Sequence, residues 1–144
     1  SLNFKTPSLA FKSCEGLNDI LINGVNGFLI DDQNNKWIGT ASGISVLNAT
    51  NVNIINYTKM YLLPPPDTLN PVVDIEMDNW GRIWVGIYVG YLAEGGVAYW
   101  NGDVWLDLDI QDGLAGLNIK DLSIDSNNDV WIATTSGISK VITQ

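Results

Sequence analysis

Three stretches of the chain alternate between apolar and polar positions. In the second of them, Ile75 and Met77 bracket Glu76. A period of two places successive side chains on opposite faces of the backbone, which is the pattern of a half-buried β-strand. A cluster of Asn, Asp and Gly follows each stretch, and an apolar segment with a tryptophan follows the cluster. Because these polar residues favour turns, each stretch is predicted to form a hairpin with the segment after it. The stretches are 25–31, 72–78 and 119–125.

The tryptophans of these hairpins recur at a constant interval of 47 residues, at Trp37, Trp84 and Trp131. An aspartate precedes each tryptophan by six residues. A repeat of about this length is typical of a β-propeller, in which each repeat forms one blade. The aspartates are Asp31, Asp78 and Asp125.

Further strands are predicted after each hairpin, which completes four antiparallel strands per repeat, the composition of a propeller blade. No segment shows the 3.6-residue period of a helix, and Pro, Gly and Asn interrupt every long segment. The predicted third strands are 44–47, 97–100 and 138–141, and the predicted fourth strands are 53–57 and 104–108.

The third repeat ends after its third strand. Phe11 lies two repeat lengths before Trp105, so residues 8–14 are predicted to form a displaced outer strand. We therefore expect one all-β domain over residues 1–144, a partial or half propeller of three four-stranded antiparallel blades. The blade repeats are 16–58, 70–110 and 117–144.

Three blades are too few to close the usual propeller ring of four to eight. One explanation is a segment of a longer propeller. The other is a head-to-tail homodimer, in which two chains form a six-bladed ring with two-fold symmetry. An open arc would leave two apolar blade faces bare, which soluble monomers avoid, so we expect association with other blades.

Composition excludes several classes of function. The net charge is −9, which disfavours nucleic acid and anionic membrane surfaces as partners. Histidine is absent and Cys14 is the single cysteine, which removes internal disulfides, cysteine-based zinc sites and Ser-His or Cys-His nucleophiles. No apolar run is long enough to span a bilayer, so no membrane insertion is expected in this segment. We expect no cofactor and no metal.

The repeated tryptophans and aspartates have simple structural interpretations. A tryptophan in the same phase of every repeat is predicted to pack against the next blade rather than to form a ligand cage. Each aspartate begins a polar turn and is predicted to cap the backbone N–H groups of that turn. Calcium binding is the alternative for these oxygen-rich turns, although they lack the full order of a calcium loop.

Two irregular segments are the candidate ligand site. Residues 59–67 connect the first two blades, and residues 88–95 form an insertion between the second and third strands of the middle blade. In propellers these two kinds of loop emerge on the same face. Aromatic rings with a few carboxylates suit a sugar or another neutral polar ligand. The alternative is a rigid Pro-rich connector and a loop tip. The predicted ligand-binding residues are Tyr61, Asp67, Tyr88, Tyr91 and Glu94.

An acidic run surrounds Trp105. Paired carboxylates can hydrolyse glycosides, whereas charge alternation along an exposed outer strand is the more ordinary interpretation. The members of this run are Asp103, Asp107, Asp109 and Asp112.

From Asp31 to Ser45 an aspartate and five residues precede Trp-Ile-Gly-Thr, and Ser-Gly-Ile-Ser follows. The segment from Asp125 to Ser139 is closely similar. With these motifs the chain resembles the two-component regulator propeller repeat. The second repeat departs from this pattern at Ile87 and at the insertion after it. The resemblance covers roughly residues 16–144. It implies the extracytoplasmic sensor region of a hybrid two-component system, as found in gut Bacteroidetes and often linked to polysaccharide use.

Three functional hypotheses follow. The leading one is a non-catalytic, periplasmic or extracellular propeller module that senses a partner or a ligand such as an oligosaccharide. The second is a propeller enzyme, either a metal-assisted lyase or lactonase or a glycosidase, and the absence of histidine counts against the metal-assisted class. The third is a structural interaction domain that self-assembles through its blades.

Overall fold

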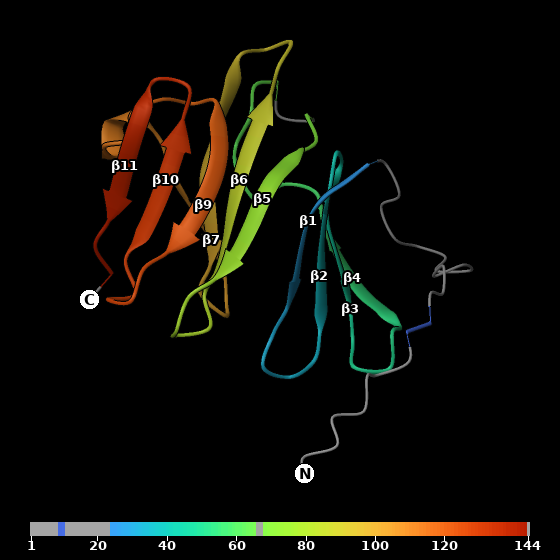
Figure 1. The fold of residues 1–144 in the computed structure, drawn as a ribbon. Helices are drawn as coiled ribbons and strands as arrows, with labels where there is room; N and C mark the ends of the chain where they lie inside the picture. Colours follow the sequence, from blue (N-terminus) through green and yellow to red (C-terminus); the bar gives the residue numbers. More distant parts are fainter. Residues whose placement is uncertain (1–8, 11–23, 66–67, 144) are drawn as a thin grey trace.

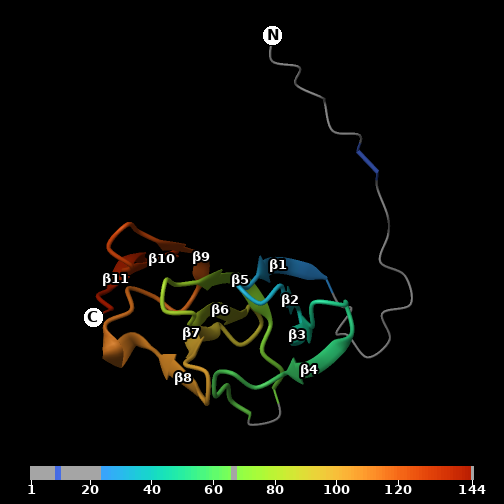
Figure 2. The same cartoon turned by 90° about the horizontal axis from the view of Figure 1, so that it is seen from below.

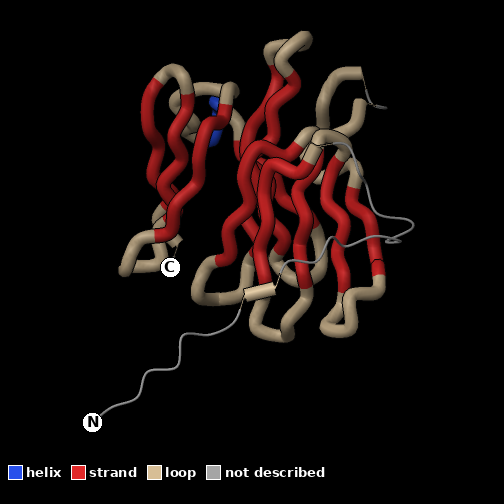
Figure 3. The backbone as a smooth tube through the Cα atoms, turned by 45° about the vertical axis from the view of Figure 1, so that its right-hand side comes forward, coloured by secondary structure: helices blue, strands red, loops and turns tan. Residues whose placement is uncertain are grey.

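The computed structural model describes residues 9–10, 24–65 and 68–143 (Figure 1). These residues form an all-β structure, and the one helical element among them is the short 3₁₀ helix η1 (Ile110–Asp112), visible in Figure 3. The predicted outer strand at 8–14 and Cys14 lie outside the described residues, except that residues 9 and 10 are described and form no strand. The strands are β1 (Val25–Ile30), β2 (Lys36–Thr40), β3 (Gly43–Leu47), β4 (Asn53–Tyr57), β5 (Val72–Met77), β6 (Ile83–Val89), β7 (Glu94–Trp100), β8 (Trp105–Leu108), β9 (Ile119–Ile124), β10 (Val130–Thr134) and β11 (Gly137–Val141).

The strands form three antiparallel sheets, each with its strands in chain order. The first sheet holds β1 to β4, the second β5 to β8, and the third β9 to β11. The third sheet therefore has three strands within the described residues, as the sequence predicts. The predicted second and third strands of the middle repeat are too short, because β6 and β7 continue pairing as far as Val89 and Glu94.

The same irregularity recurs in the first hairpin of every sheet. The register shifts after Val25 in β1, after Val72 in β5 and after Ile119 in β9, which are equivalent positions of the 47-residue repeat. A bulge of this kind bends and twists a strand. Its recurrence shows that the three sheets are copies of one backbone design.

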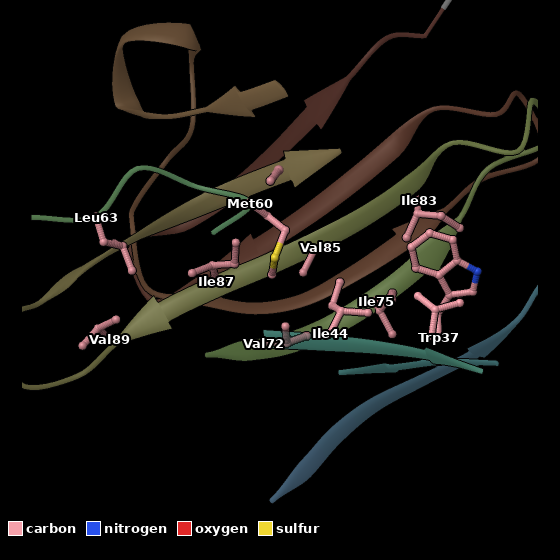
Figure 4. Packing of buried hydrophobic residues seen from close by; sticks show 12 residues of the cluster. Trp37, Ile44, Met60, Leu63, Val72, Ile75, Ile83, Val85, Ile87 and Val89 are labelled. Carbon is pink, nitrogen blue, oxygen red and sulfur yellow. The ribbon is translucent and has the colours of Figure 1, made fainter. Parts of the chain in front are cut away.

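The first strands of the sheets lie side by side, with β5 between β1 and β9 (Figure 2). One apolar cluster fills the space between the first and second sheets and includes Ile44, Ile75 and Val85 (Figure 4). A second cluster, with Trp84 and Leu122, joins the second sheet to the third. The core of the molecule is thus two successive interfaces between sheets.

A glycine lets neighbouring sheets approach closely at each of the two interfaces. A Cβ atom at Gly39 would lie 2.5 Å from Cγ1 of Val72, and one at Gly86 would lie 2.6 Å from Cγ2 of Ile119. No carbon atoms can approach so closely, so the first strand of each following sheet packs directly on bare backbone. Ala133 occupies the equivalent position in the third sheet.

Candidate functional site

One aspartate organises the turn of each repeat. Its Oδ1 accepts hydrogen bonds from the backbone N–H groups two and four residues later, at 2.9–3.0 Å. Its Oδ2 accepts one from the indole N–H of the tryptophan of the same repeat, at 3.0, 2.9 and 2.8 Å along the chain. The six-residue spacing of Asp and Trp is therefore a hydrogen-bonded unit, in agreement with the predicted capping of the turn.

The hydrogen bonds to these aspartates favour the ionised form. Burial raises the pKa of Asp31 and of Asp78, but the bonds from Trp37, Trp84 and the turn outweigh it, so both pKa values lie below the ordinary one. For Asp125 the bond from Trp131 is the largest cause of a lowered pKa. The carboxylate oxygens thus already accept donors from the protein. Within the described residues, no group of three or more His, Cys, Asp or Glu side chains could hold a metal ion.

The three tryptophans differ in burial. Trp37 is 8% exposed and Trp84 is 1% exposed, because the next sheet covers each of them. Trp131, in the last sheet, is 36% exposed, and the ammonium group of Lys140 lies 5.1 Å from its ring centroid. The predicted core role thus holds for the first two tryptophans, whereas none of the three described sheets covers the third.

The segment after β4 forms a small pocket against the second sheet. The pocket has a volume of about 250 Å³ and is lined by Lys59, Met60, Tyr61, Leu62, Trp105 and Asp107. The buried side chain of Asn70 holds this segment in place, since its Oδ1 accepts the backbone N–H groups of Met60 at 2.7 Å and Tyr61 at 2.6 Å.

Tyr61 lies in acidic surroundings. Its ring lies over Gly96, where an added Cβ would be 2.4 Å from Cε2 of the tyrosine. Burial, followed by the negative charges of Asp109, Asp107 and others, raises the pKa of Tyr61 to about 12. The phenol therefore stays protonated at neutral pH and can donate a hydrogen bond.

The other predicted site residues are only partly gathered around Tyr61. Glu94 pairs with Val89, whose side chain faces the first sheet, so Glu94 lies on the same side as Tyr61. Tyr88 is adjacent to Val89 in the strand and therefore faces the third sheet. Tyr91 is 83% exposed at the hairpin tip. Asp67 lies outside the described residues.

The expected insertion loop at 88–95 is mostly strand. Its side chains meet those of residues 59–67 in part, because Val89 belongs to the same apolar cluster as Met60 and Leu63. The continued pairing of β6 with β7 leaves only residues 90–93 as a tip. In a strand, neighbouring side chains point to opposite faces, so Tyr88 is directed away from the pocket.

Two strand residues complete the pocket, Trp105 and Asp107. Both lie in the acidic run of the sequence but outside the predicted ligand site. They are two apart in β8 and face the same side as Ala98, a residue of the first apolar cluster. The Trp105 indole N–H is buried and has no hydrogen-bond partner among the described residues. The alternation of β8 could have revealed this face. Of the rest of the acidic run, Asp109 and Asp112 cap η1 reciprocally.

A pair of carboxylates bridges the inner strands of the second and third sheets. Oδ2 of Asp74 accepts the backbone N–H of Leu122 at 2.8 Å. Burial, together with a side-chain hydrogen bond to Asp121, raises the pKa of Asp74. Burial also raises the pKa of Glu76, with Asp74 and Asp121 adding to the shift. The three acidic groups therefore interact with one another.

The comparisons with known proteins yield a structural relative. No family model and no curated protein matches the chain. The chain is similar in structure to PorZ, an essential bacterial surface component of the type-IX secretion system of Porphyromonas gingivalis, with a TM-score of 0.62 and 19% sequence identity. The match covers 83% of this chain and 17% of PorZ, so the chain spans about a sixth of that protein. Within the described residues, there is no helix with the length and hydropathy that crossing a membrane requires.

Proposed function

We propose that the three sheets are blades of a β-propeller and that the chain is a non-catalytic binding module. The observation that carries the proposal is the repetition of one interface. The second sheet packs on the first as the third packs on the second, with β1, β5 and β9 along the same edge (Figure 2). When each sheet is related to the one before it by the same rotation, the sheets are arranged around an axis like the blades of a propeller.

The two outer faces of this arc carry the residues that form its inner interfaces. On the first sheet, Phe28 is 55% exposed, whereas Ile75 and Leu122 at the equivalent positions are 3% and 2% exposed. We call this surface, formed by Val25, Phe28 and Ile30, the leading face. A further blade before the first sheet would bury it.

The third sheet exposes the complementary surface. Ile138 is 63% exposed, whereas its equivalents Ile44 and Val97 are fully buried. We call this surface, formed by Trp131, Ala133, Ile138 and Lys140, the trailing face. The partner proposed for either face is another blade of the same repeat, from a longer parent chain or from a second copy bound head to tail.

The proposed role is sensing outside the cytoplasm, as the periplasmic or extracellular sensor part of a two-component system that responds to an oligosaccharide. The resemblance of the repeats to two-component regulator propellers supports this role, as does the Tyr61 pocket. The pocket combines two aromatic rings with a carboxylate, which suits a neutral polyhydroxylated ligand. PorZ is a surface component, which supports a location outside the cytoplasm.

Scanning calorimetry with a panel of oligosaccharides tests the sensing role. A ligand that binds only the folded chain stabilises it by about 2.7 kcal/mol at a concentration 100 times its Kd, which raises the melting temperature. We expect the rise to be lost in Asp107→Asn, because Asp107 lines the pocket. It should persist in Asp103→Asn, which changes an exposed carboxylate of the same acidic run. If no sugar shifts the wild-type transition, carbohydrate sensing is wrong.

A structural module that self-assembles is the second candidate, and the two bare faces favour it. This candidate predicts that the melting temperature rises with protein concentration, because association stabilises the folded state by mass action. A transition that responds to concentration but to no sugar would support assembly over sensing. A transition that responds to neither would count against both roles.

A further inference from the structure

A second cleft lies between the first two sheets, at the end where the β1–β2 and β5–β6 turns emerge. Its volume is about 450 Å³. Trp37, Met77 and Trp100 contribute apolar lining, and Asp32 and Gln33 contribute polar lining. In Figure 1 these turns lie at the lower end of the sheets, whereas the β6–β7 hairpin rises at the upper end. The cleft and the Tyr61 pocket share no lining residue, although the ring of Trp100 in the cleft lies 5.5 Å from that of Trp105 in the pocket.

The cleft exists because one side chain is missing from the repeat. Between the second and third sheets, the Asn128 side chain fills the equivalent position, where its Oδ1 accepts the backbone N–H of Asn79 at 2.7 Å. At the first interface, Gly81 is the repeat equivalent of Asn128, and Asp32 is the repeat equivalent of Asn79. A glycine has no amide to extend across the interface. The first interface thus stays open at the place where the second is bridged.

A second substitution widens the same cleft. At the second interface, Arg82 bonds to Asp78 through Nε at 2.5 Å and lies 5.6 Å from the ring centroid of Trp84. In the first sheet, Asn35 replaces this arginine and reaches Asp31 with its shorter side chain, at 3.0 Å. Trp37 is accordingly less covered than Trp84.

The backbone at position 81 would accept the missing side chain. The equivalent residues Asn34, Gly81 and Asn128 have φ angles of 62°, 79° and 65°, so all three lie in the left-handed region. Asparagine tolerates this region better than most residues with a side chain. A Cβ atom at Gly81 would meet nothing within 4 Å. The glycine is thus required neither by the turn nor by packing.

We propose that this cleft binds a small uncharged ligand with an apolar ring face and several hydroxyl groups, such as a hexopyranose unit. Its volume falls within the usual range for small-molecule sites. The indole of Trp100, half-buried, offers a surface for the ring. Both oxygens of Asp31 accept donors from their own turn and Trp37, so Asp32 and Gln33 are the exposed side chains placed to bond hydroxyls.

Titration of the ¹⁵N-labelled chain with glucose, galactose, mannose and N-acetylglucosamine, each alone, tests the proposal by NMR. We expect at least one sugar to give saturable shifts of the Trp37 and Trp100 indole N–H signals and of the Asp32 and Gly102 amides. In Gly81→Asn the new amide should bridge to the Asp32 N–H and occupy the cleft, so the affinity should fall at least tenfold. This variant should fold at least as stably as the wild type, because it restores a contact found at the second interface.

The control is Asn128→Gly, which exchanges the same two residue types in the third sheet and should leave binding at the first interface unchanged. The proposal is overturned if none of the four sugars shifts the cleft signals of the wild type. It is also overturned if Gly81→Asn binds as tightly as the wild type. Shifts confined to residues 59–62 and 105–107 would report the Tyr61 pocket instead, so the two sites fail or succeed separately.

Discussion

At the scale of single residues, the fold depends on a hydrogen-bonded unit used three times. The same aspartate oxygen accepts the same two backbone N–H groups in every turn, and the other oxygen accepts the indole N–H. What changes along the chain is burial. Asp78 is 2% exposed, and its neighbour sheets exclude water from the unit, whereas the unit of Asp125 faces solvent. The units of Asp78 and Asp125 therefore have the same geometry but should contribute unequally to the stability of the fold.

Replacing Asp78 by Asn tests this difference. The amide would place a donor group against the indole N–H of Trp84 and the guanidinium of Arg82, which would lose their acceptor. A buried donor left without a partner costs about 1–3 kcal/mol, so we expect a loss of that size in the free energy of unfolding. Urea titration followed by tryptophan fluorescence measures it. The matched variant Asp125→Asn should lose less, because water can replace the lost acceptor. Equal losses would contradict the role of burial.

At the scale of elements, the strands could be predicted from the sequence because apolar and polar residues alternate along the first strand of each repeat and turn-forming residues separate the strands. The fourth strand 53–57 coincides with β4, and the ends of most other strands differ by a residue. The exception is the β6–β7 hairpin. The sequence 88–95 departs from the pattern of the other two repeats, which predicts a loop, but β6 and β7 stay paired as far as Val89, which is buried.

The candidate site was predictable only in part, because the segment 88–95 is a pair of strands and not the loop that the sequence predicts. Residues 59–62 do form a pocket, and the charge of Glu94 acts on Tyr61 in it. Tyr88 faces the other way because the parity of a strand decides the side on which each residue lies. Parity cannot be assigned to a segment interpreted as a loop. The alternation of charge around Trp105 and Asp107 predicts an exposed outer strand, since the sequence does not show that residues 59–62 lie against β8.

The link between β5 and β9 should make stability depend on pH. Asp74 has a raised pKa in the folded chain, so its contribution is most favourable below its unfolded pKa, 3.8, and is lost as the pH rises through the folded value. Asp31 and Asp78 have lowered pKa values, so their contribution is present above 3.8 and is lost as the pH falls through the folded value. The two sets of carboxyl groups therefore oppose each other in mild acid.

The variant Asp121→Asn changes the surroundings of Asp74 and leaves those of Asp31 and Asp78 unchanged, so it isolates the contribution of Asp74 to the pH dependence. At pH 7 an amide beside Asp74 replaces a repelling carboxylate with a hydrogen-bond donor, so the variant should be more stable than the wild type. Near pH 3 the carboxyl group of Asp74, whose pKa is raised, is largely protonated, so the charge repulsion is lost and the advantage should vanish. Unfolding free energies from urea titrations at the two pH values measure the effect. An advantage that is the same at both pH values would show that charge repulsion is not its cause.

At the scale of the whole molecule, the arc of three sheets ends in two unlike apolar faces. The leading face repeats residues that are buried in the second and third sheets, and the trailing face repeats residues that are buried in the first and second. A contact between two such faces is heterologous, and it closes only when the accumulated rotation completes a ring. The 47-residue interval predicts the repeated unit, but the number of units in a ring depends on the angle between sheets, which a sequence period does not encode.

The trailing face departs from its inner counterparts in two ways. Ala133 replaces the glycine that admits Val72 and Ile119 at the inner interfaces, and Lys140 stands where Val46 is buried in the first sheet. The methyl group of Ala133 holds an incoming strand farther away, and Lys140 has to move from the Trp131 ring before a blade can dock. The outer contact should therefore be weaker than the inner ones.

Sedimentation equilibrium over a range of protein concentrations tests the central claim most directly, that both outer faces are surfaces for docking another blade. The account predicts that the 15.7 kDa chain associates as its concentration rises. Phe28→Asp on the leading face and Ile138→Asp on the trailing face should each abolish association, whereas Tyr91→Asp at the exposed hairpin tip should not. A wild-type chain that remains a monomer at every concentration, or that associates equally in all three variants, would contradict the claim.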